Sequence, residues 1–209
     1  MSRARAANGR PASRWRRLVA LGFIATLTAC GGSDKSRYAN EPDPRAGEYV
    51  IGASDELDIQ VWKSPELNTK IRVRPDGYLT MALVGDLKAE GLTPSHLREQ
   101  ITKKLRAFLR EGEPVVTVAV TGVNSYHVTV AGSVTTPGRY ASPVYLTVAD
   151  AIALAGGPTR FADPEETVVL RRNGNGTVRR IEVDYERILE GKSQDQNLVL
   201  LRGDVVFVP

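Results

Sequence analysis

The spacing of apolar residues in the first half of the chain predicts strands joined by tight turns. Leu57, Ile59 and Val61 alternate with polar residues, which is the period of a half-buried strand. A hairpin is predicted over residues 71–81, because Pro-Asp-Gly at 75–77 is a turn sequence in which proline sets φ and glycine accepts a positive φ. These elements indicate a small sheet near the start of the folded region.

One amphipathic helix follows these strands. Thr93 suits the N-cap position and Pro94 the first helical position. Behind them, apolar and charged side chains fall on opposite faces of a helix: Leu97, Ile101, Leu105 and Phe108 are apolar, and Arg98, Glu99, Lys103, Lys104 and Arg106 are charged. The charged face is typical of a solvated surface, and a binding site is the alternative interpretation. A valine-rich strand at 115–120 completes an α+β unit with a single helix.

The second half of the chain has the pattern of a small mixed sheet crossed by one helix. Strands are predicted at residues 126–132, on both sides of the Asn-Gly-Asn-Gly hairpin signal at 173–176, and at the C-terminal end. Thr147 and Asp150 form a capping-box pattern at the start of a short alanine-rich helix, which Gly-Gly-Pro at 156–158 ends. Such an arrangement is the β-grasp pattern.

The N-terminal segment, residues 1–29, reads as a bacterial lipoprotein signal peptide. A basic region with six arginines and no acidic residue precedes twelve mostly apolar residues, too short a run for a transmembrane helix. Leu-Thr-Ala-Cys at 27–30 then resembles a lipobox, whose cysteine carries a diacylglyceryl group and an N-acyl chain. Cys30 is therefore the expected lipidation site, and an ordinary cleaved signal with a free cysteine is the alternative. Gly31 after the cysteine implies sorting to the outer membrane.

Residues 30–47 lie between the lipobox and the first predicted strand. They contain few apolar side chains to bury. We therefore predict a lipidated flexible tether, with a mean reach of roughly 20–25 Å for a chain of this length.

Composition excludes several classes of function. The chain of 209 residues has a net charge of +4, from 28 basic and 24 acidic residues. Without the six leader arginines, 22 basic residues face 24 acidic ones, a net charge of −2, so a nucleic-acid role loses its support. One cysteine and two histidines argue against a disulfide framework or a Cys/His metal site. His96 and His127 are interpreted as structural, and we expect no catalytic residue, no metal and no enzyme activity.

Ordered motifs in the two halves resemble those of outer-membrane polysaccharide-export lipoproteins. Residues 48–122 resemble the polysaccharide biosynthesis/export domain, and residues 123–209 resemble one SLBB domain, a soluble-ligand-binding β-grasp. The motif residues in the first half are Tyr49, Gly52, Asp55, Leu57, Val73, Asp76, Gly77, Leu83, Val84, Gly85, Gly91, Leu92 and Thr93. Those in the second half are Val130, Gly132, Val134, Pro137, Gly138, Thr147, Val148, Ala151, Ile152, Ala155, Gly156, Gly157, Leu200, Gly203, Asp204, Val205, Val206 and Val208. The resemblance implies an α+β fold of two small domains, with structural roles for the motif glycines, the motif aspartates and Pro137.

The family resemblance also implies a function. It implies a periplasm-facing outer-membrane lipoprotein that oligomerises as a ring in a capsular or exopolysaccharide export translocon. The implied partners are an inner-membrane polysaccharide co-polymerase, a separate outer-membrane barrel and the exopolysaccharide, with no nucleic acid and no cofactor besides the lipid on Cys30. The alternative is a monomeric lipid-anchored module that binds glycan or a partner protein without transport.

The chain departs from the family pattern in a local backbone position and, with more consequence, in length. The family commonly has glycine where this chain has Ser54. Well-known members continue into further β-grasp repeats and a C-terminal amphipathic helix, whereas this sequence stops at Pro209, so we expect no pore formed by the chain itself. The short form resembles exporters that accompany exosortase/PEP-CTERM exopolysaccharide clusters.

Two sets of side chains are candidates for contact with a glycan or a neighbouring subunit. Four arginines, Arg171, Arg172, Arg179 and Arg180, flank the hairpin turn and are interpreted as a basic patch for an acidic glycan or a neighbour's carboxylates, with a solvated hairpin as the alternative. Trp62 and Tyr126 are candidates for stacking on sugars, with packing in a core or an interface as the alternative.

Overall fold

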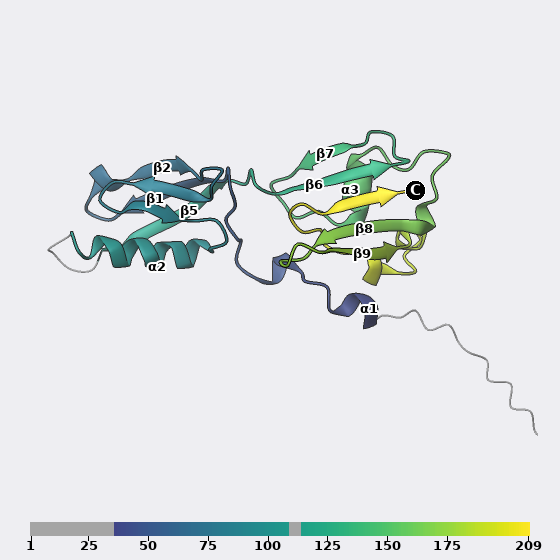
Figure 1. Ribbon diagram of the computed structural model, residues 1–209, viewed down its shortest axis with the longest axis horizontal. Helices are drawn as coiled ribbons and strands as arrows, with labels where there is room; N and C mark the ends of the chain where they lie inside the picture. The colour runs from purple at the N-terminus through teal and green to yellow at the C-terminus, as the bar shows by residue number, and fades with distance from the viewer. Residues whose placement is uncertain (1–35, 109–113) are drawn as a thin grey trace, which may run out of the picture. The chain divides into compact units, whose positions relative to one another are not determined.

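The computed structural model describes residues 36–108 and 114–209, whose helices and strands form two groups (Figure 1). Each group has its own hydrophobic core. Around the first core, an antiparallel three-stranded sheet has the order β2-β1-β5, and helix α2 lies along one of its faces. A two-stranded sheet of β3 and β4 accompanies it. The elements of this region are β1 (Glu56–Val61), η2 (Pro65–Leu67), β2 (Thr69–Arg72), β3 (Tyr78–Met81), β4 (Gly85–Lys88), α2 (Pro94–Leu105) and β5 (Val116–Gly122).

The helix of the first region begins as predicted and ends earlier. The Thr93 side chain accepts the backbone N–H of His96, with Pro94 in the first turn. Its apolar face is buried in the first core through Leu97, Ile101 and Leu105. The prediction was wrong for Phe108, which is 54% exposed. Because the helix ends at Leu105, Phe108 no longer follows the helical period that would place it on the buried face.

The turn at residues 75–77 forms, but the predicted hairpin around it does not. Gly77 has a φ of +82°, and its N–H donates to the carbonyl of Arg74. The flanking strands nevertheless pair with different partners, β2 with β1 and β3 with β4. The backbone of Val73, directly after β2, explains why β2 does not pair with β3. Its carbonyl accepts the N–H of Ser54 and its N–H donates to the carbonyl of Asp55, so the end of β2 stays beside the residues that lead into β1.

The second core lies under a mixed five-stranded sheet with the order β7-β6-β10-β8-β9. Strand β10 is parallel to β6, and the remaining pairs are antiparallel. This sheet with one helix across it is the β-grasp arrangement that the sequence predicts. Its elements are β6 (His127–Gly132), β7 (Gly138–Ala141), α3 (Val148–Leu154), η3 (Pro164–Glu166), β8 (Thr167–Arg172), β9 (Val178–Val183), α4 (Tyr185–Leu189), η4 (Gln194–Gln196) and β10 (Val205–Val208).

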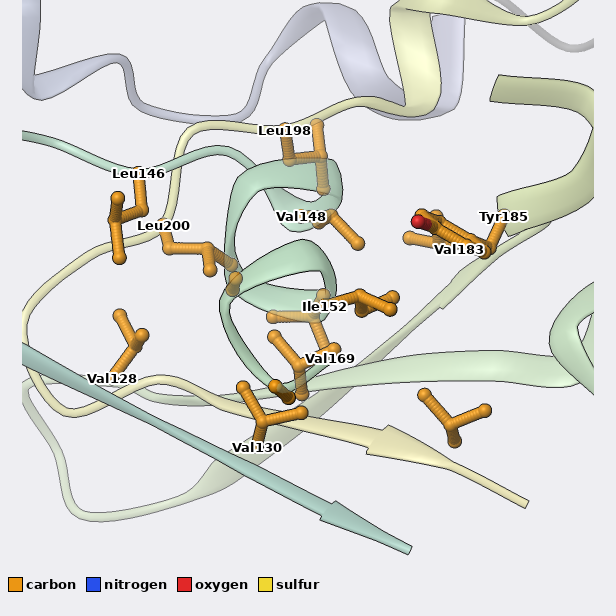
Figure 2. Packing of buried hydrophobic residues seen from close by; sticks show 14 of the residues in the cluster. Val128, Val130, Leu146, Val148, Ile152, Val169, Val183, Tyr185, Leu198 and Leu200 are labelled. Carbon is orange, nitrogen blue, oxygen red and sulfur yellow. The ribbon is translucent and has the colours of Figure 1, made fainter. Parts of the chain in front are cut away.

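Helix α3 covers the inner face of this sheet. Thr147 and Asp150 form the predicted capping box at its start. Figure 2 shows Val148 and Ile152 of the helix directed toward side chains of the strands, among them Val130 and Val169. Alternate strand residues therefore supply one side of the core and the helix supplies the other.

The prediction of a flexible tether was wrong for the part of residues 30–47 that the structure describes. This part contains α1 (Ser36–Ala39) and the turn η1 (Pro44–Ala46). The Tyr38 hydroxyl donates to the carbonyl of Glu182 on β9, and the Glu41 carboxylate is buried against Arg171. A tyrosine hydroxyl and a carboxylate therefore fix this segment to the β-grasp sheet. The prediction considered only how many apolar residues the segment contains, and so it missed these polar contacts.

The predicted signal peptide, Cys30 and Gly31 lie outside the described residues. Among the helices at residues 36–108 and 114–209, none has the length and apolar character needed to cross a membrane.

Candidate functional site

A buried carboxylate, Asp55, joins the opening motif of the first region to the start of the second. Its Oδ1 accepts the backbone N–H groups of Asn124 and Ser125, at 2.8 and 2.7 Å. Its Oδ2 accepts the N–H of Gly52 at 2.7 Å and the hydroxyls of Tyr49 and Ser125 at 2.6 and 3.0 Å. Five donors on one carboxylate compensate for removing its charge from water. The motif residues Tyr49, Gly52 and Asp55 therefore form one structural unit.

Side chains around Asp55 leave no room for variation at Gly52. A Cβ atom added there would lie 2.5 Å from Cβ of Ser125 and 2.0 Å from the Arg202 guanidinium. Ser54 has a φ of +76°, a left-handed conformation that glycine would adopt at lower cost than serine. Burial and the hydrogen bond to Asp55 raise the pKa of Tyr49 to about 12, so its hydroxyl stays a donor at neutral pH.

A second buried charge cluster forms where β8, β10 and the N-terminal segment meet. Arg171 donates to both Asp204 carboxylate oxygens, with the shortest contact at 2.6 Å. It also donates to the Val199 carbonyl at 3.1 Å and to Glu41 at 3.0 Å. Glu41 in turn pairs with Arg179. Buried guanidinium and carboxylate groups are compatible with folding only when paired in this way.

The predicted basic patch of four arginines does not exist as one surface. Arg171 is buried, and Arg179 lies beside it on the same face because the two are register partners across β8 and β9. Arg172 and Arg180 are exposed on the opposite face of these strands. The prediction was wrong for Arg171, because the two-residue strand period separates neighbours and places every second side chain toward the core.

The two aromatic candidates have opposite environments. Tyr126 is a core residue, 2% exposed, whose hydroxyl accepts the Leu146 N–H and donates to the Leu200 carbonyl. Its predicted stacking on sugars was therefore wrong, and the core alternative is correct. Trp62 is 71% exposed, directly after β1. For Trp62 the core alternative is wrong, and its indole is available to a ligand.

Two hollows on the surface of the first region share one wall residue. The first, of about 350 Å³, includes Gln60, Trp62 and Thr117 in its lining, and the second, of about 610 Å³, lies between α2 and the start of β5. Val115 lines both and is 61% exposed. Trp62 was a candidate from the sequence, but the two hollows were not predicted. They form where β1, β5 and α2 meet, and no local pattern indicates that these elements are neighbours.

Motif residue Asp76 and most of the motif glycines lie in turns or at strand ends. Asp76 pairs with Arg74 and accepts the Tyr78 N–H at the turn before β3, and Gly138, after Pro137, begins β7. Positive φ angles occur at seven of the motif glycines, Gly77, Gly85, Gly91, Gly132, Gly156, Gly157 and Gly203.

Neither histidine belongs to a cluster with catalytic geometry among the described residues. His96 lies beside its helix cap Thr93, and the His127 ring lies 3.0 Å from the carbonyl oxygen of Ser125. In the described ranges no three His, Cys, Asp or Glu side chains are grouped so that they could hold a metal ion.

Glu41 is a structural residue that the sequence analysis missed. It lies in a segment with few apolar neighbours, and the only available signal was the set of unexplained arginines around the hairpin. Its role depends on Arg171, 130 residues away.

Comparison with known families and proteins divides the chain at the same junction. A model described as polysaccharide biosynthesis/export protein matches residues 43–121, and an SLBB domain model matches residues 127–182.

Three curated proteins are among the similar ones. The exopolysaccharide production protein ExoF of Rhizobium meliloti (strain 1021) is 32% identical over 151 residues, which are 67% of this chain and 33% of the relative. The EPS I polysaccharide export outer membrane protein EpsA of Ralstonia solanacearum is 28% identical over 78% of this chain and 48% of the relative. The capsule polysaccharide export outer membrane protein CtrA of Neisseria meningitidis (serogroup A) is 28% identical over 78% and 45%. The chain spans a third to about half of these relatives, and their names describe production or export rather than a reaction.

Proposed function

Because this chain belongs to the polysaccharide biosynthesis/export proteins, we propose that it takes part in moving an exopolysaccharide across the bacterial envelope. In this proposal it is a non-enzymatic component at the outer membrane, facing the periplasm and working in a capsular or exopolysaccharide translocon.

One observation carries the proposal. Both family domains occur on this chain in order, and a motif carboxylate of the first, Asp55, receives the backbone N–H groups at the start of the second. The two regions are thus joined through a motif residue, in addition to matching the two family models in sequence.

Attachment to the membrane is proposed through lipid on Cys30. Buried methylenes contribute about 0.8 kcal/mol each, so several acyl chains hold a protein firmly. Tyr38 is bound to β9, only eight residues after Cys30 in the sequence. Even a fully extended chain of that length spans at most about 29 Å. The anchor would therefore keep the β-grasp region close to the membrane surface.

Assembly with other copies and with an inner-membrane polysaccharide co-polymerase completes the proposal. Among the described strands, β2 and β5 each pair on one side only, as do β7 and β9. Such edges are able to pair with a neighbour unless they are protected. A ring of copies would surround a passage in which weak, distributed polar contacts let a hydrated polymer slide.

Deleting the gene and measuring polysaccharide in the medium and in the periplasm tests the export role. We expect loss of the polymer outside the cell and its recovery when the wild-type gene is restored. Cys30→Ser is the matched variant for the anchor: it should abolish incorporation of labelled fatty acid and release the protein from the membrane fraction. Unchanged secretion in the deletion strain would contradict the proposed function.

The mass of the detergent-extracted, intact protein tests assembly. A discrete multiple of the protomer supports a closed ring. A monomer at every concentration would contradict self-assembly and favour a lipid-anchored binding module.

A further inference from the structure

Trp62 is held at an unusual place for a large aromatic side chain. It follows the last residue of β1, and its backbone N–H donates to the Val115 carbonyl at 2.9 Å. The next residue, Lys63, has a φ of +63°, a left-handed conformation that costs a residue with a side chain about 1–2 kcal/mol. A strained turn that fixes an exposed indole points to a role outside folding.

Polar side chains adjoin this indole in the smaller hollow. Gln60 and Thr117 are register partners on the face of β1 and β5 that α2 does not cover. Asn68 uses its Oδ1 to accept the Val61 N–H, so its amide NH₂ is the donor that remains for a ligand. An aromatic face with amide and hydroxyl groups around it suits a sugar ring, which has an apolar face and hydroxyls at its rim.

The larger hollow adds positive charge next to the first. Arg98 and Lys103 of α2 line it, as does Arg106 directly after the helix, and Glu99 is the one acidic residue among the lining residues that the structure describes. Val115 is a wall of both hollows, so the hollow beside the indole and the hollow beside the cations adjoin at the start of β5. Both volumes fall within the range of about 300–1,000 Å³ that is usual for ligand sites. The excess of cations favours an anionic occupant.

We propose that these two adjoining hollows, together called the Trp62–Lys103 groove, bind a segment of an acidic polysaccharide, with a sugar ring on the indole and sugar carboxylates beside Arg98 and Lys103. The inference rests on the proposed function and specifies its substrate class as a uronic-acid-type polymer rather than a neutral one. The contacts are few and exposed, which gives the weak, salt-sensitive binding that a moving polymer requires.

Calorimetric titration of the intact, detergent-solubilised chain with a hexamer of galacturonic acid tests the groove, with maltohexaose as the neutral probe. We expect the acidic hexamer to bind more tightly, and its binding to weaken as salt is raised. Trp62→Ala should weaken it by about three- to tenfold, in line with the energy of an aromatic contact. The double variant Arg98→Gln/Lys103→Gln should weaken it and reduce its salt dependence.

Two matched controls separate the groove from other exposed surfaces. Phe161→Ala removes an aromatic ring that is 77% exposed in the second region, and Arg172→Gln/Arg180→Gln removes two exposed cations there. Both controls should bind like the wild type. Each groove variant changes exposed side chains, so its circular dichroism and urea midpoint should also match the wild type.

Several outcomes would overturn the inference. They are equal binding of the neutral hexamer, no binding of the acidic hexamer at millimolar concentration, and loss of binding only in the Arg172/Arg180 control. A change of oligomer mass on Trp62→Ala would assign the groove to a protein interface instead. Secretion by the deletion strain tests the proposed function independently of the groove. If export requires the chain but the groove binds no acidic hexamer, this inference fails and the proposed function stands.

Discussion

The Asp55 carboxylate accepts the backbone N–H of Ser125, seventy residues later in the chain, at 2.7 Å. The same carboxylate accepts the N–H of Gly52 in its own turn. One side chain therefore determines the local fold of the opening motif and holds the strand-to-strand connection that leads into β6.

Replacing Asp55 by asparagine should destabilise the protein strongly. One carboxylate oxygen becomes an NH₂ group that faces donors, so buried N–H and O–H groups lose their acceptor. We expect the free energy of unfolding to fall by about 2–4 kcal/mol. Urea unfolding followed by far-UV circular dichroism measures this change. Asp58→Asn, a partly exposed residue of β1, the strand that follows Asp55, should change it by less than about 0.5 kcal/mol. Equal effects of the two variants would show that the five hydrogen bonds contribute little.

Replacing Glu41 by glutamine should loosen the N-terminal segment and weaken the β-grasp region. The substitution leaves the buried Arg171 with Asp204 as its remaining charged partner and removes the partner of Arg179. We expect a loss of about 1–3 kcal/mol in the free energy of unfolding. Hydrogen exchange at residues 36–46 should also become faster. Glu66→Gln, an exposed residue, is the matched control. Unchanged exchange in the Glu41 variant would mean that the segment is held without the ion pair.

Two glycine variants distinguish the cost of a positive φ from the cost of a steric clash between an added Cβ and the neighbouring strand. Gly132 has a φ of +92°, and an added Cβ would lie 2.0 Å from the carbonyl oxygen of Val208 on the neighbouring strand. Gly203 has a φ of +80° with open space around it. Gly203→Ala should therefore cost about 1–2 kcal/mol, the penalty of the left-handed conformation alone. Gly132→Ala should cost clearly more, because β10 must also move. Thermal unfolding of the two variants checks the order, and equal costs would argue against the close approach.

The stability of the protein should decrease in mild acid through His127. Burial and the nearby charge of Arg139 lower the pKa of its ring from 6.5. The unfolded chain then binds a proton at this site at a higher pH than the folded chain does. The stabilisation is therefore present above about pH 6.5 and is lost as the pH falls through the folded value. Urea unfolding at about pH 7.5 and about pH 5 should show a smaller difference for His127→Gln than for the wild type.

The matched histidine variant is His96→Gln, at an exposed position on α2. A proton-NMR titration of this variant reports His127 alone, since the chain has two histidines. A midpoint at or above 6.5 would contradict the expected direction.

Local patterns predicted much of the fold. Thr93 and Pro94 mark the true start of α2, and Thr147 with Asp150 marks that of α3. These signals are reliable because a cap is made with backbone groups two or three residues away. The pairing around residues 75–77 could not be predicted, because a turn motif does not determine which strands its flanks will join.

Local patterns were enough to locate α2 and α3, the alternation of the main strands and the order of the two family motifs, since these depend on residues close together in the chain. The three-dimensional structure was needed to show that Tyr126 is buried and Trp62 exposed, and that Arg171 is a core ion-pair partner of Asp204 and Glu41. It was also needed to show that the hollows lined by Trp62 and by Lys103 share Val115 as a wall. Burial and charge pairing depend on which distant strands and helices meet, and no local pattern determines the register of those contacts.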